Sequence, residues 1–115
     1  MNLTEEQITQ NWSDLKSKIS DNFTGDRLIK LNTLYDDLGT NMMTAPASGI
    51  EHFHNSFIGG YVDHVINVIN CTEKLYDLWS EMGADMSGYT KEEIMFCALN
   101  HDLGKVGDKD NEYYI

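Results

Sequence analysis

The pair His101-Asp102 is the feature of this chain with the clearest capacity for chemistry. It lies in the run ALNHDLGK at residues 98–105, at the end of an apolar stretch and just before a glycine. An imidazole nitrogen and a carboxylate oxygen are both ligands for divalent metals, so the pair can hold a cation. A helix that ends here would add partial negative charge, which favours a cation nearby. Because consecutive helical residues point about 100° apart, the two side chains can share one ion only if it lies beside the helix.

His64 is the second candidate ligand, and it comes from an earlier helix. The spacing of Val62, Val65 and Ile69 predicts a long helix from about Tyr61 to Met82. His64 lies beside this apolar face rather than opposite it. Taken alone, the placement favours a histidine at the edge of the core, bound to a backbone carbonyl, over a metal ligand.

The segment before His64 favours the metal-ligand interpretation over the core-edge one. It reads HNSFIGGYVDH over residues 54–64, and the later run reads HDLGK over residues 101–105. Together the two runs resemble the HD-domain superfamily of metal-dependent phosphohydrolases. In motif they are most similar to bacterial HD-domain 3′→5′ exoribonucleases and to plasmid- and phage-encoded HD proteins. The resemblance covers roughly residues 50–107 and is weak over the first 45.

The resemblance implies a role for each matching residue. His64, His101 and Asp102 would be metal ligands, Asp102 and Lys105 would take part in catalysis, and Lys105 and His54 would lie at the substrate. Lys105 as a solvated cation at a helix end and His54 as a turn residue are equally weighted alternatives. Two nitrogens and a carboxylate suit Mn, Fe, Co, Ni or Zn better than Mg alone, as one ion or two. The implied reaction is hydrolysis of a nucleotide or other phosphate ester by a metal-activated water.

The end of the chain departs from the family pattern. Members of this superfamily usually add an aspartate from a later helix, whereas Asp108 and Asp110 lie in a glycine-flanked tail that ends in YYI. We therefore expect either the N-terminal portion of a longer protein or a naturally truncated one, in both cases without the later helices. The alternative function is a catalytically incomplete HD-like module that binds a nucleotide or a protein partner. A di-iron oxygenase of the HD type is a further reading that nothing in the sequence selects.

The elements that must position these residues are all expected to be helices. No segment alternates with a period of two, so we expect an all-α, HD-domain-like bundle in one domain over residues 1–115. The N-terminal helices would fill residues 1–45 and the HD-like core residues 50–107. Thr4 with Gln7 and Thr90 with Glu93 are capping boxes that begin two of the helices.

The remaining boundaries follow from glycines and apolar spacing. A helix after Thr24 should end at Gly39, and residues 40–58 should form a loop with at most one helical turn. The long helix should carry Tyr76 and Trp79 on its apolar stripe and end at Gly83. The helix that bears His101 should end near residue 104.

Charge and composition limit the partners. The formal net charge is −11, which opposes non-specific attraction to nucleic acid. No run reaches the length of a membrane span, and the N-terminus has no secretory signal. Cys71 and Cys97 are expected to be buried thiols in a reducing cytoplasm. The expected partner is a small phosphate ester in the cytoplasm, and a homo-oligomer remains open.

Overall fold

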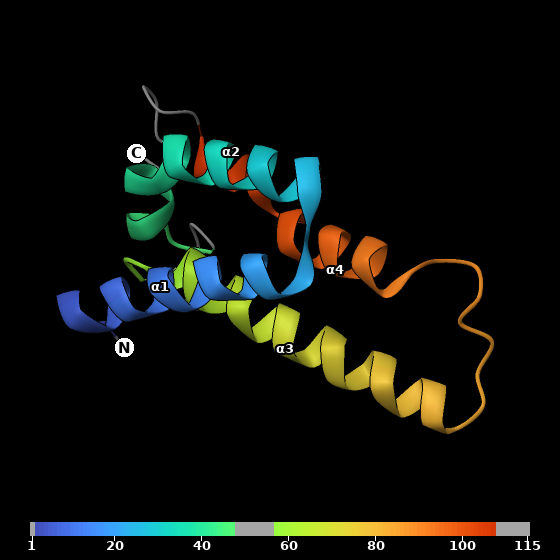
Figure 1. Cartoon of the computed structure of the whole chain (residues 1–115). Helices are drawn as coiled ribbons and strands as arrows, with labels where there is room; N and C mark the ends of the chain where they lie inside the picture. Colours follow the sequence, from blue (N-terminus) through green and yellow to red (C-terminus); the bar gives the residue numbers. More distant parts are fainter. Residues whose placement is uncertain (1, 48–56, 108–115) are drawn as a thin grey trace.

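The computed structural model describes residues 2–47 and 57–107 (Figure 1). These residues form helices and no strands, which confirms the all-α prediction. The elements are α1 (Glu5–Asn22), α2 (Gly25–Thr44), α3 (Gly60–Glu81), α4 (Lys91–Asn100) and the short 3-10 helix η1 (Leu103–Val106).

Both predicted capping boxes are present. In α4 the Thr90 hydroxyl accepts from the Glu93 backbone N–H at 3.1 Å, and the Glu93 carboxylate accepts from the Thr90 backbone N–H at 3.1 Å. The backbone N–H and then the hydroxyl of Thr90 lower the pKa of the Glu93 carboxyl. Thr4 and Gln7 make the same reciprocal pair at the start of α1. Four otherwise unpaired groups at the two helix starts are thereby satisfied.

The predicted end of the second helix is wrong, because α2 continues through Gly39 to Thr44. Gly39 is buried, and a Cβ built on it would lie 3.3 Å from the Trp12 indole. The glycine therefore serves close packing of α2 against α1 rather than a turn. Met42, one turn further on, is fully buried, so tertiary packing sustains the helix beyond the glycine. Only residues 45–47 of the expected loop are described and non-helical, together with the turn before α3.

The core lies between the first three helices and the buried face of α4. Its fully buried members include Leu15, Tyr35, Val65 and Leu99, one from each helix. The second half of α3, yellow in Figure 1, extends beyond the end of α1. Trp79 lies there and is 53% exposed, so its predicted place in the core is wrong. Apolar spacing identifies a face but does not say where neighbouring helices stop covering it.

The predicted burial of the two cysteines is also wrong. Cys71 and Cys97 are both free and exposed. Cys71 lies on the face of α3 that points away from buried Ile69, and Cys97 precedes the buried pair Ala98 and Leu99. Within the described ranges, no helix combines the length and apolarity needed to cross a membrane.

Candidate metal centre

The start of α3 fixes the position of His64. Gly59, the residue before the first residue of α3, has a left-handed φ of +83°, and a Cβ there would lie 2.8 Å from Ile8 Cγ1. Only glycine combines this conformation with so close an approach. Tyr61 and Val62, in the first turn, are buried, which holds this end of the helix in the core and leaves His64 at the core edge.

The end of α4 fixes the position of His101 and Asp102. The Tyr35 hydroxyl, from α2, donates to Asn100 Oδ1 at 2.8 Å and lies 3.4 Å from the Leu99 carbonyl oxygen. Asn100 Nδ2 in turn donates to the Phe96 carbonyl at 2.9 Å. The last turn of α4 is therefore tied to α2 immediately before the His-Asp pair.

The helix ends earlier than predicted, at Asn100 rather than near residue 104. His101 is the C-cap, and Asp102, with φ −115° and ψ 16°, leaves the helical conformation and is the N-cap of η1. This break changes the direction of the Asp102 side chain relative to a continuous helix. The two side chains can consequently meet at one point without the constraint of a 100° separation.

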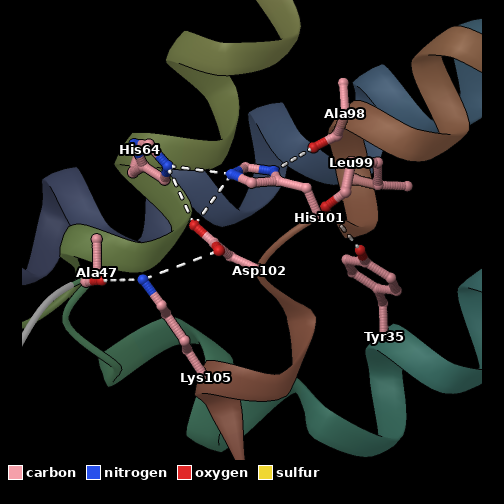
Figure 2. A network of polar contacts seen from close by, with 8 residues as sticks. All are labelled: Tyr35, Ala47, His64, Ala98, Leu99, His101, Asp102 and Lys105. Atoms are coloured by element: carbon pink, nitrogen blue, oxygen red, sulfur yellow. Dashed lines mark hydrogen bonds and ion pairs between the residues drawn. The ribbon is translucent and has the colours of Figure 1, made fainter.

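Three potential ligand atoms converge in this region (Figure 2). His64 Nε2 lies 3.3 Å from His101 Nε2 and 3.4 Å from Asp102 Oδ2, and His101 Nε2 lies 3.0 Å from Asp102 Oδ2. In the described part of the chain, these residues form a group of His, Cys, Asp or Glu whose ligand atoms are close enough to hold one metal ion. The three side chains are 18%, 36% and 22% exposed in chain order, so the cluster is accessible to a small solute.

These separations match the spacing of ligands around a single cation. With ligand distances of about 2.1 Å, neighbouring ligands lie roughly 3.0 Å apart in an octahedron and roughly 3.4 Å apart in a tetrahedron. His64, His101 and Asp102 would each supply one ligand atom to such a cation, and three ligands would leave coordination positions for water or a bound molecule.

The protonation of His101 suits a metal ligand. Its Nδ1 lies 2.8 Å from the Ala98 carbonyl oxygen, which can only accept, so Nδ1 carries the hydrogen and donates it. In the neutral ring, Nε2 then presents a lone pair to the cluster. A backbone carbonyl that fixes the tautomer of a histidine in this way is typical of metal sites.

Lys105 lies beside the cluster on η1. Its Nζ donates to the Ala47 carbonyl at 3.3 Å and lies 3.8 Å from Asp102 Oδ1, the oxygen that does not face the histidines. An ammonium group has three N–H donors. One donates to the Ala47 carbonyl, and the contact with Asp102 at 3.8 Å is an ion pair rather than a hydrogen bond, so N–H donors are available to an oxygen atom of a bound molecule.

Tyr61 is a residue near the site that sequence reasoning missed. It is 1% exposed, and its hydroxyl has no hydrogen-bond partner among the described residues. Burial, and then the Asp102 carboxylate, raise the pKa of this phenol above its usual range. The i, i+3 spacing of Tyr61 and His64 could have indicated a shared face, but aromatic residues in this position are usually core. The carboxylate of Asp63, the neighbour of His64 in sequence, accepts a hydrogen bond from Asn11 Nδ2 at 3.5 Å.

His54, Asp108 and Asp110 lie outside the described residues, so their predicted positions are not tested. No family model, curated protein or solved structure matches this chain.

Proposed function

We propose that the chain is a metal-dependent phosphohydrolase of the HD type, acting on a nucleotide or another phosphate ester. The observation that carries the proposal is the convergence of His64 Nε2, His101 Nε2 and Asp102 Oδ2 at 3.0–3.4 Å from one another. Ligands of this kind suit Mn, Fe, Co, Ni or Zn. The described residues supply three ligands, which is enough for one ion with open positions.

His64, His101 and Asp102 would bind the metal, and Lys105 would compensate charge on the substrate. His64 and His101 supply neutral nitrogen ligands, and Asp102 supplies one negative charge. A bound divalent cation would polarise a phosphate oxygen and lower the pKa of a water molecule. Lys105 would donate an N–H to a phosphate oxygen and compensate the charge that develops there.

The charge balance at the cluster favours an anionic ligand. One carboxylate and one ammonium cancel, and the histidines are neutral as ligands, so a divalent cation would leave a net positive site. The rest of the chain is strongly acidic, with a formal net charge of −11. A small phosphate ester is favoured over a long nucleic acid, because it can reach the site without lying along an acidic surface.

The proposal is tested first by metal binding. Calorimetric titration with Mn²⁺, Co²⁺ and Zn²⁺ should give one ion per chain for the wild type and none for His64→Ala or Asp102→Ala. Asp77→Asn, which removes an exposed carboxylate from the same helix, is the matched control and should bind normally. A well-folded wild-type chain that binds none of these metals would refute the proposal.

Hydrolysis is tested on the same variants. The metal-loaded wild type should release product from nitrophenyl phosphates or from a panel of nucleotides, and both ligand variants should lose this activity. Lys105→Met should retain the metal and lower kcat, because it removes a phosphate contact but no ligand. Metal binding without any hydrolysis would instead favour the catalytically incomplete HD-like binding module. This alternative is supported by the ligand group itself, which consists of three ligands among the described residues.

A further inference from the structure

The second half of α3, together with its C-cap Met82, carries a row of large apolar side chains that the rest of the described chain does not cover. Leu75 is 42% exposed, Leu78 48%, Trp79 53% and Met82 76%. The opposite face of this half-helix contacts the body of the protein, where Asp77 pairs with Lys91 at 3.2 Å. The apolar row therefore points away from the molecule.

The spacing of this row is that of a coiled-coil seam. Exposed Cys71 extends the row by one turn, and Cys71, Leu75, Leu78 and Met82 follow one another at intervals of four, three and four residues. This is the alternation of a and d positions in a heptad repeat, with Trp79 at an e position. We define these five residues as the α3 seam.

We propose that the α3 seam pairs with the α3 seam of a second copy of this chain, with the two helices antiparallel. In this arrangement a and d positions face each other across a twofold axis. Leu75 of one copy packs on Leu78 of the other, and Cys71 packs on Met82. Each contact occurs twice because the interface is symmetric.

Charge on one flank of the seam favours the antiparallel arrangement. Lys74 and Glu81 both occupy g positions, and g positions face each other in an antiparallel pair. Lys74 of one copy then lies opposite Glu81 of the other, and the twofold axis repeats this ion pair. In a parallel pair Lys74 would instead lie near the Trp79 indole of the second copy, without an acidic partner.

The size of the seam agrees with a reversible dimer. The exposed parts of the four large side chains amount to roughly 500 Å² per copy, so these side chains would bury at most about 1,000 Å² in a pair, which is the lower limit for a specific interface. Area alone does not distinguish this face, because monomers often carry apolar patches of this size. The heptad spacing and the opposed charges distinguish it. The long-range repulsion between two acidic chains is screened beyond about 8 Å at physiological salt.

The first test is sedimentation equilibrium over a dilution series of the full chain. The wild type should show a monomer–dimer equilibrium, and Leu78→Ser should be monomeric with unchanged helical circular dichroism. Lys74→Glu and Glu81→Lys should each weaken dimerisation about tenfold, and the double variant should restore it. Lys30→Glu, which changes an exposed charge on α2, should have no effect. A wild type that stays monomeric up to about 1 mM, or a double variant as weak as either single one, would overturn the proposal.

The second test reports the direction of the helices. In a Cys97→Ser background, the two copies of Cys71 would lie about 16 Å apart along the antiparallel pair, too far for a short bismaleimide. Adding Met82→Cys should give a cross-linked dimer, because positions 71 and 82 face each other. A cross-link through Cys71 alone would indicate parallel helices and would contradict the proposed arrangement.

Discussion

Two buried tyrosines, Tyr35 and Tyr61, allow a matched test of what the hydroxyl groups near the site contribute. Both rings are at most 1% exposed. The Tyr35 hydroxyl donates to Asn100 at 2.8 Å, whereas the Tyr61 hydroxyl has no partner among the described residues. Replacement by phenylalanine removes the same atom in each case and leaves no large cavity.

The two substitutions should have different effects on the free energy of unfolding. A buried hydrogen bond contributes about 1 kcal/mol, and the loss of one partner leaves the other unsatisfied. Tyr35→Phe should therefore lower the free energy of unfolding by about 1–2 kcal/mol. Tyr61→Phe removes a buried polar group that has already lost its contact with water, so it should be neutral or stabilising by about 1 kcal/mol. The difference corresponds to several degrees in Tm.

Urea unfolding of both variants in the presence of a chelator measures these values without a contribution from bound metal. Titration with Co²⁺ or Zn²⁺ then shows whether the Tyr35–Asn100 contact positions the ligands as well as stabilising the fold. Because this contact holds the residue just before His101, Tyr35→Phe should weaken metal binding about tenfold. Equal destabilisation by both variants would refute the reasoning about the hydroxyls. An unchanged metal affinity in Tyr35→Phe would refute the positioning role.

Three further predictions concern the scaffold. Gly59→Ala should lower the free energy of unfolding in urea by about 3 kcal/mol or more, because a left-handed conformation is combined with a 2.8 Å approach to Ile8. Gly25 is also left-handed but has nothing within 4 Å of a Cβ, so Gly25→Ala should lower it by only about 1–2 kcal/mol. Of the six tyrosines, Tyr35 and Tyr61 should ionise only when the protein unfolds, as followed by tyrosinate absorbance, because their folded pKa values are raised above 10. Each raised pKa contributes stability below pH 10 that is lost by about 1.4 kcal/mol per pH unit above it. Thr90→Ala should lower the free energy of unfolding by about 1 kcal/mol through loss of the cap, and an unchanged urea midpoint would contradict this.

The starts of α1 and α4 could be predicted from local sequence because their cause is local. The capping boxes at Thr4 and Thr90 join residues three apart and need no knowledge of the rest of the fold. The end of α2 could not be predicted in this way. Gly39 is a common helix terminator, but here it lies against Trp12 from another helix, and only the packed structure reveals that contact.

The proximity of the candidate ligands could be predicted only in outline. The motifs around His64 and His101 predict that two helices bring them together, and the structure does bring them to 3.3 Å. The Tyr35–Asn100 contact that holds this arrangement joins residues 65 positions apart and has no motif. The end of α4 at Asn100, which places Asp102 outside the helical conformation, is likewise not predicted by the apolar pattern and Gly104.

The cluster joins two points of the chain that are 37 residues apart, His64 and His101. A cation bound by both would close a loop that contains most of α3, the exposed 82–90 connection and all of α4. Closing a loop of this length by a covalent cross-link would restrict the unfolded chain by about 4 kcal/mol. A protein nicked by a protease within residues 82–90 should therefore hold its two fragments together while the cation is bound. Addition of a chelator should remove the cation that links the two fragments and so weaken their association.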